Sequence, residues 1–273
     1  MNILALVVVY KTDLDSSDTL QSLARQSCTE GLHVFVWDNS PEEASVAKKA
    51  WLSHQFQHAN YHHDGKNTPL STLYNTVIDQ SLLGVREEYQ YLILFDQDSI
   101  VESTFFAAMG AAAMQHPEIQ LLLPIVKSDD KIVSPAHLYY FKGIFWRRPR
   151  FGPIKARFTT AINSGMMISA GYLSRYFPGY PPELRFYGTD TWLCQTLSTT
   201  HQWIYVVDTA IKHNLAQFCE ERTDVKLWRH GEKIKATRFL NRQGFFRRNF
   251  CFLYTAMGCI RDAIKYRDRR FVQ

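Results

Sequence analysis

The segment YLILFDQDS, residues 91–99, constrains the fold more than any other part of the sequence. Five apolar residues lead directly into Asp96 and Asp98. A continuous apolar run of this length is typical of a strand that is covered on both faces, as in a parallel sheet. A second apolar run, residues 33–38, ends in the same way at Asp38. Ligands of such sheets bind at the carboxyl ends of the strands, so we expect these aspartates to lie in a ligand site.

Helical periodicity separates the predicted strands. The segments DSSDTLQSLARQ, PEEASVAKKAWLSHQF and PLSTLYNTVIDQSLL alternate with apolar strands at residues 3–10, 33–38 and 91–96. This alternation predicts an α/β fold with a mostly parallel central sheet. Farther along, the sequence predicts an irregular stretch at 127–158, a helix at 189–200 and a last strand at 203–208.

The composition fits one large domain, or one domain with an appendage. Hydrophobic residues make up 46% of the 273 residues, enough for a sizeable core. The five cysteines are scattered and form no CxxC pair, which argues against a disulfide framework and favours the reducing cytosol. No stretch approaches the roughly 20 apolar residues of a membrane-spanning helix.

The C-terminal segment differs in charge from the rest of the chain. Residues 222–273 contain 14 Lys and Arg against 4 Asp and Glu, whereas the remainder has 17 against 22. We therefore predict a domain at residues 1–221 and a basic, amphipathic, helical tail at 222–273. Arginines interleaved with Phe, Leu and Tyr favour contact with an anionic membrane surface. Packing on the domain is the alternative, and without a recognisable module nucleic acid is not an expected partner.

The spacing of Asp96 and Asp98 suits a divalent metal ion. Mg²⁺ and Mn²⁺ prefer oxygen ligands and often bind one or two carboxylates together with substrate phosphates. Two aspartates one residue apart, just beyond a strand, can reach the same ion. The alternative is that both are simply solvated carboxylates at a strand end.

Several segments in order resemble the GT-A glycosyltransferases of family 2, which are inverting enzymes that use nucleotide sugars. The resemblance covers roughly residues 3–215. The segments that carry it are VWDNS, NTPLSTLYNTV, FDQDS, NSGMMIS, FYGTDTWLCQTL and IKHNLAQ. The form of FDQDS is similar to that of bacterial rhamnosyltransferases that use dTDP-L-rhamnose. Departures occur in NTPLSTLYNTV, where Pro69, Leu73 and Val77 stand at positions usually held by Gly, Ala and Gly.

The resemblance implies roles for particular residues. Asp190 is expected to be the catalytic base, with a plain helix cap as the alternative. Mg²⁺ or Mn²⁺ would be bound by Asp96, Asp98 and His213, although His213 could instead be a structural residue. The nucleotide sugar is expected to contact Asp38, Asn67, Asn75, Asp96 and Gln97, and Asp38 could alternatively serve a turn. The acceptor side is expected to include Asn163, Ser164, Gly165 and Trp192.

The resemblance also implies a function. The protein would transfer a sugar, L-rhamnose from dTDP-L-rhamnose, to a hydroxyl of a growing bacterial surface glycan such as an O-antigen or capsule intermediate. It would work in the cytoplasm, peripherally on the inner face of the cell membrane. The alternatives are a UDP-sugar donor, a phosphohydrolase of the haloacid dehalogenase type, and a binding module without catalytic activity.

Overall fold

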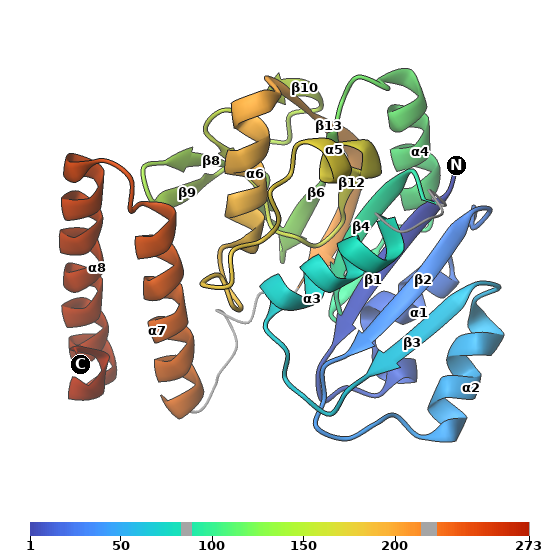
Figure 1. Cartoon of the computed structure of the whole chain (residues 1–273), viewed down its shortest axis with the longest axis horizontal. Helices are drawn as coiled ribbons and strands as arrows, with labels where there is room; N and C mark the ends of the chain where they lie inside the picture. Colours follow the sequence, from blue (N-terminus) through green and yellow to red (C-terminus); the bar gives the residue numbers. More distant parts are fainter. Residues whose placement is uncertain (83–88, 214–222, 273) are drawn as a thin grey trace.

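The structure is a computed structural model that describes residues 1–82, 89–213 and 223–272 (Figure 1). Its first half alternates strands with helices, as the sequence predicts. The elements are β1 (Ile3–Val9), η1 (Leu14–Ser16), α1 (Asp18–Ala24), β2 (Leu32–Asp38), α2 (Val46–Gln55), β3 (Ala59–His63), α3 (Leu70–Val77), η2 (Ile78–Leu82), β4 (Tyr91–Asp96), β5 (Ser99–Val101) and α4 (Phe105–Gln115).

The second half contains shorter strands and the C-terminal helices. The elements are β6 (Leu121–Ser128), β7 (Lys131–Ser134), β8 (Ala136–Tyr139), β9 (Lys142–Phe145), β10 (Gly152–Lys155), β11 (Thr159–Thr160), β12 (Met166–Ser169), α5 (Ala170–Arg175), α6 (Thr189–Thr200), β13 (Trp203–His213), α7 (Thr223–Leu240), α8 (Phe245–Tyr266) and η4 (Arg269–Val272). The predicted domain boundary, between residues 221 and 222, lies outside the described residues.

The described part of the chain forms a ten-stranded sheet in the order β10-β13-β6-β12-β4-β1-β2-β3, with β5 and β7 beside this path. The predicted α/β class is confirmed. The half formed by β4, β1, β2 and β3 is parallel, as expected. The other half is mixed, because β12 runs antiparallel between β4 and β6, whereas β6 and β13 pair in parallel. A four-residue strand is too short to show its direction in the sequence pattern.

The region 127–158 was predicted to be irregular, but it contains four strands of four residues each, namely β7, β8, β9 and β10. β8 and β9 form a hairpin that belongs to a separate three-stranded sheet with β11. Strands this short expose part of their surface and show little periodicity. The sequence therefore did not indicate them.

Two apolar cores lie on opposite faces of the large sheet, and β1 serves both. Its alternate residues Ile3, Ala5 and Val7 pack with α1, α2 and α4, whereas Leu4 and Leu6 pack with α3, α5 and α6. This follows from the period of two in a strand. Figure 1 shows α3, α5 and α6 in front of the sheet. Packing on both faces of the sheet therefore fixes the position of the sheet edge where the predicted site lies.

Gly165 allows the loop before β12 to pass close to the sheet. Its φ of +82° lies in the left-handed region, and its N–H donates to the Leu94 carbonyl oxygen over 2.7 Å. A Cβ here would lie 2.3 Å from Ile211 Cδ1 and 2.9 Å from Pro124 Cγ. Only glycine satisfies both restrictions.

We expect Gly165→Ala to lower the free energy of unfolding by about 2–5 kcal/mol, because backbone strain adds to overpacking. Gly152→Ala is the matched control, since Gly152 has a φ of +91° but nothing within 4 Å of its Cβ position. The control should lose only about 1–2 kcal/mol. Urea denaturation measures both values, and equal losses in the two variants would contradict the close approach described here.

Candidate active site

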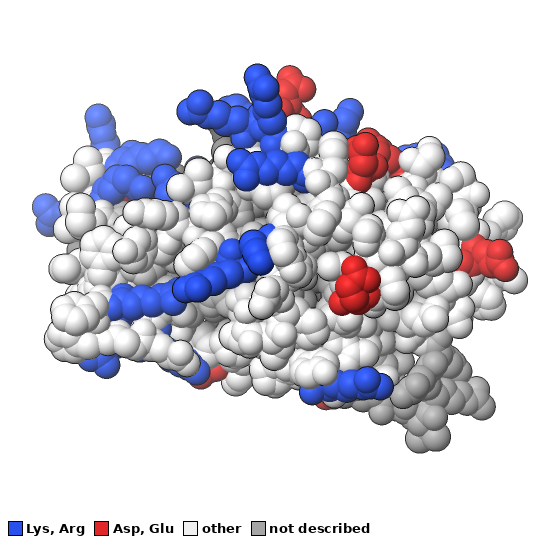
Figure 2. Space-filling view, turned by 90° about the horizontal axis from the view of Figure 1, so that it is seen from above, with Lys and Arg blue, Asp and Glu red and all other residues white. Residues whose placement is uncertain are grey.

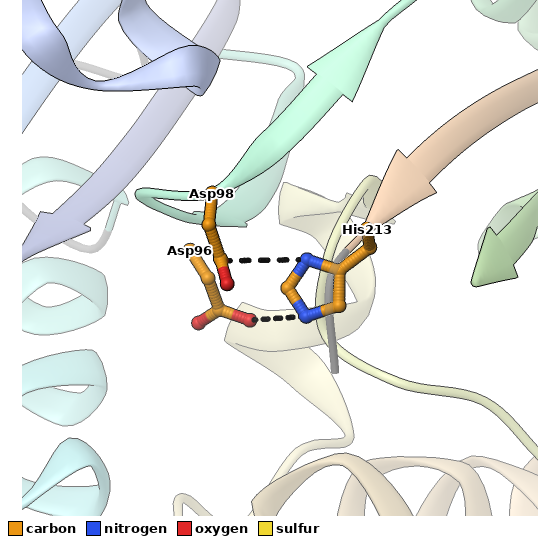
Figure 3. Close-up of side chains that lie close together, drawn as sticks. All are labelled: Asp96, Asp98 and His213. Carbon is orange, nitrogen blue, oxygen red and sulfur yellow. Dashed lines mark ion pairs between the residues drawn. The ribbon is translucent and has the colours of Figure 1, made fainter. Parts of the chain in front are cut away.

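Asp96, Asp98 and His213 come together at one edge of the sheet (Figure 3). Asp96 ends β4, Asp98 lies in the tight turn to β5, and His213 ends β13. Asp98 Oδ1 lies 3.4 Å from His213 Nδ1, and Asp96 Oδ2 lies 4.0 Å from His213 Nε2. One ligand atom from each residue lies within 4.8 Å of the other two.

Neighbouring hydroxyl groups hold this cluster in place. Ser164 donates its hydroxyl to Asp96 Oδ2 over 2.8 Å, and the Ser99 hydroxyl lies 3.1 Å from His213 Nδ1. Both serines and His213 are buried. Burial raises the pKa of Asp98, and the nearby Asp96 carboxylate raises it further, while His213 opposes the shift.

This set of donors suits a divalent cation. Two carboxylates and an imidazole that converge from two strands provide oxygen and nitrogen ligands, and a positive charge would relieve the repulsion between Asp96 and Asp98. Within the described residues, Asp96, Asp98 and His213 could therefore hold a metal ion.

The ends of β1, β2 and β4 are tied together beside this cluster. Tyr10 N–H donates to Gln97 Oε1 over 2.6 Å, and Lys11 N–H donates to the Ser40 hydroxyl over 2.8 Å. Asn39 Nδ2 donates to Asn67 Oδ1 over 3.1 Å. Polar side chains and backbone from three strand ends thus form one wall.

Asp190 lies on the other side, in the first turn of α6. Its carboxylate accepts from Thr191 N–H over 2.6 Å. Gly188, not Asp190, is the N-cap of α6, so Asp190 is not the helix cap that was the alternative. Loss of hydration raises the pKa of Asp190 to about 6, and the Asp96 carboxylate adds to the shift. A raised pKa in a cleft is typical of an acid or base that acts near neutral pH.

Asn163 connects the two sides. Its Nδ2 donates to Thr189 Oγ1 over 3.0 Å and approaches the Tyr74 hydroxyl at 3.4 Å. The next residue, Ser164, bonds to Asp96. Two consecutive side chains of one loop thus contact Asp96 on one side and the start of α6 on the other.

The metal-binding candidates Asp96, Asp98 and His213 and the Asp190 carboxylate line one cleft of about 1040 Å³. That volume lies at the upper end of the range of about 300–1,000 Å³ that is usual for small-ligand pockets, which is large enough for a nucleotide. Seven of the predicted site residues line it, namely Asn67, Asp96, Gln97, Asp98, Asn163, Asp190 and His213.

Five predicted site residues are not among the described residues that line this cleft, namely Asp38, Asn75, Ser164, Gly165 and Trp192. The buried Asp38 carboxylate accepts from the Tyr61 hydroxyl and from Ser40 N–H. Asn75 exchanges two hydrogen bonds with the backbone of Tyr180. The remaining three also have internal partners, since Ser164 supports Asp96, Gly165 supports the loop, and the Trp192 indole donates to the Gly179 carbonyl.

Other lining residues were not predicted. Tyr10, Lys11 and Asn39 follow the first two strands, and their place at strand ends was a signal that could have indicated them. Arg229 and Lys233 come from α7, in the segment predicted to be a separate tail. The Lys233 ammonium also lies 5.3 Å from the centre of the Tyr187 ring. No local signal links α7 with the cleft.

Comparison with known proteins gives a structural match. No family model and no curated protein matches the sequence. A crystal structure of S. aureus TarS has a TM-score of 0.59 and 12% identity, over 94% of this chain and 70% of that one. A mannosyltransferase from Pyrobaculum calidifontis, PcManGT, in complex with GDP-Man and Mn²⁺, has a TM-score of 0.59 and 11% identity, over 93% and 70%.

A third structure, GalNAc-T7 with UDP, GalNAc and Mn²⁺, has a TM-score of 0.59 and 11% identity over 78% of this chain and 44% of that one. Identities this low are evidence for the fold alone. The arrangement of strands and helices, together with these three matches, shows that this chain has the GT-A fold of the glycosyltransferases.

Proposed function

We propose that the protein transfers a sugar from a nucleotide-sugar donor to a hydroxyl group, with inversion at the anomeric carbon. The observation that supports this best is one cleft containing both the Asp96, Asp98 and His213 cluster and the raised-pKa carboxylate of Asp190. The similar structures of TarS and PcManGT were determined with UDP-GlcNAc and with GDP-Man. A nucleotide-sugar donor is therefore the first ligand to test.

The donor is proposed to lie against the wall made by the ends of β1, β2 and β4. Asn67, Gln97 and Asp96 line the cleft there, together with Lys11 and Asn39. Asp38 would act through Ser40, because its carboxylate accepts from Ser40 N–H and the Ser40 hydroxyl accepts from Lys11 N–H. Asn75 would act through the loop that it holds at Tyr180.

We propose dTDP-L-rhamnose as the donor, from the resemblance of FDQDS to rhamnosyltransferases, with UDP-sugars as the alternative. Calorimetric titration with dTDP-rhamnose, UDP-GlcNAc, UDP-galactose and GDP-mannose separates these donors. Tightest binding of a UDP-sugar would overturn the rhamnosyl assignment while leaving the transferase assignment intact.

We propose that Asp96, Asp98 and His213 bind Mg²⁺ or Mn²⁺. When bound, such an ion supplies charge neutralisation to the departing nucleoside diphosphate. Ser164 holds Asp96 in the orientation that the cluster needs.

Asp190 is proposed to be the base. An acceptor hydroxyl must lose its proton as it attacks the anomeric carbon, and inversion requires a base on the side opposite the leaving group. Asp96 and Asp98 would bind the metal ion on the side of the leaving group, so neither would serve as this base. Asp190 belongs to α6, a different element of the same cleft, and Asn163 beside it would position the acceptor.

The acceptor is proposed to be a hydroxyl of a growing bacterial surface glycan, carried on a lipid. Asn163 would contact it directly. Gly165 and Trp192 would hold the surrounding backbone in place through their hydrogen bonds. The phosphohydrolase alternative is disfavoured by the glycosyltransferase fold, and we expect no hydrolysis of a generic phosphate ester.

Metal removal should abolish transfer. We expect chelation to stop sugar transfer and added Mg²⁺ or Mn²⁺ to restore it. Asp98→Asn should weaken Mn²⁺ binding at least about tenfold, the lower end of the effect of losing even an outer-shell partner. Calorimetry measures this binding, with Asp130→Asn as the control because Asp130 is exposed in the β6–β7 turn. Undiminished transfer by Asp98→Asn in chelator would contradict the metal assignment.

Asp190→Asn should keep the fold and the donor affinity but lower transfer by about 10²–10⁴-fold, the usual contribution of general-base catalysis. Asp208→Asn, at an exposed position of β13, is the matched control and should leave transfer unchanged. The measurement is transfer to a defined acceptor beside donor affinity by calorimetry. A joint loss of donor affinity would mean that Asp190 holds the donor instead.

The pH dependence of sugar transfer should reflect the ionisation of the Asp190 carboxyl group. The base is the ionised carboxylate, so a pKa of about 6 makes transfer fall about tenfold per pH unit below pH 6 and level off above it. An aspartate with an ordinary pKa of about 3.9 would keep its rate down to about pH 5. A flat rate between pH 7 and pH 5 would therefore count against Asp190 as the base.

A further inference from the structure

Helix α8 packs on α7 through a narrow polar face. Cys251 and Thr255 are buried in this contact. Arg238 of α7 donates to Thr255 Oγ1 over 3.0 Å, and Cys251 Sγ lies 3.6 Å from the Thr237 carbonyl oxygen. Most of the opposite face of α8 is therefore turned away from α7.

That opposite face carries an apolar stripe. Its six side chains follow one another at intervals of three or four residues and are 52–86% exposed, namely Phe246, Phe250, Leu253, Met257, Ile260 and Ile264. The β8–β9 hairpin extends the surface, because the Phe141 ring lies 5.6 Å from that of Phe250. An apolar surface of this length normally marks an interaction site.

A basic groove adjoins the stripe. The cavity between α7, α8 and η4 measures about 570 Å³. Its lining includes five basic or imidazole side chains, namely Lys226, Arg229, His230, Lys233 and Arg261. Asp262 is the one acidic residue among the described lining residues, and it contacts His230 at 3.1 Å and Arg261 at 2.8 Å. Met257 belongs to both the stripe and the groove.

The charges identify what covers the stripe. Arg247, Arg261 and Lys265 lie along one flank of it by helical spacing, and Asp262, the single acid of α8, is turned toward His230 of α7. A second copy of α8 would bring arginine against arginine. An anionic lipid surface instead complements the flank and the groove. Figure 2 shows Lys and Arg side chains gathered on the side of the molecule that carries these helices, with few Asp and Glu among them.

We propose that α8 lies in the surface of an anionic bilayer, with the stripe in its apolar layer and a lipid phosphate in the groove between α7 and α8. The 22 residues of α8 span about 33 Å, at 1.5 Å per residue, along the membrane plane. Among the described helices, none has the length and hydropathy to cross a membrane.

The groove also communicates with the cleft. Arg229 and Lys233 line both, so the groove and the cleft adjoin the same part of α7. A lipid-carried acceptor bound in the groove would therefore lie next to the cleft that contains Asp190. That last consequence rests on the proposed function, whereas the lipid contact itself does not.

Co-sedimentation of the full chain with vesicles tests the proposal. We expect binding to vesicles that contain phosphatidylglycerol, weaker binding as salt rises from 0.1 to 0.5 M, and little binding to pure phosphatidylcholine. Met257→Gln should weaken binding by roughly tenfold. Met114→Gln on α4 is the matched control, since the two methionines are 70% and 72% exposed. Ile264→Gln, at 73% exposure, provides a second stripe variant.

Arg261→Gln tests the groove, with the exposed Arg25→Gln as its control. We expect about a fivefold loss of vesicle binding from the first and none from the second at low salt. Three results would overturn the proposal. They are equal binding to neutral and anionic vesicles, a dimer in sedimentation velocity that Met257→Gln dissolves, and binding of free pyrophosphate without any vesicle binding. None of these readouts requires sugar transfer, so failure here is separate from failure of the proposed function.

Discussion

The contacts of one short loop position most of the candidate site. Asn163 donates to Thr189 beside Asp190, and Ser164 donates to Asp96. Gly165 bonds to the end of β4 through a backbone conformation that other residues rarely adopt. Asp96 and Asp98 lie more than ninety residues before the proposed base Asp190 in the sequence, and this loop contacts both segments. The distance in space between the two aspartates and Asp190 therefore depends on how the loop before β12 packs.

The two cores explain why that edge is rigid. Alternate side chains of β1 enter opposite cores, so the strand cannot shift by one residue without turning its whole apolar set to the wrong face. The register between β1 and β4 fixes the position of Asp96 at the carboxyl end of β4. Strand β13 is parallel to β6 and carries His213 to the same edge. Three rigid strand ends thus present polar groups to one cleft.

The C-terminal helices connect the cleft with an outer surface. The Trp228 ring of α7 lies 5.2 Å from that of Phe186, and the Phe239 ring lies 6.1 Å from that of Trp192, so α7 packs on the loop and helix that carry Asp190. The apolar stripe of α8 faces away from these contacts. Side chains of α7 therefore line both the cleft and the groove. The division into a domain and an independent tail stays a prediction, and α7 forms part of the site.

The sequence by itself determined the features that depend on local pattern. Continuous apolar runs predicted the buried strands, and aspartates at their ends predicted an acidic site at one sheet edge. Interleaved arginines and aromatics predicted an amphipathic basic helix. Only the tertiary structure decided the direction of β12, the approach of His213 to both Asp96 and Asp98, and the hydrogen bond between Asp38 and Tyr61. It also brought Arg229 to the cleft. Periodicity reports which face of an element is buried, whereas the meeting of distant side chains depends on register, loop conformation and packing, which no local pattern encodes.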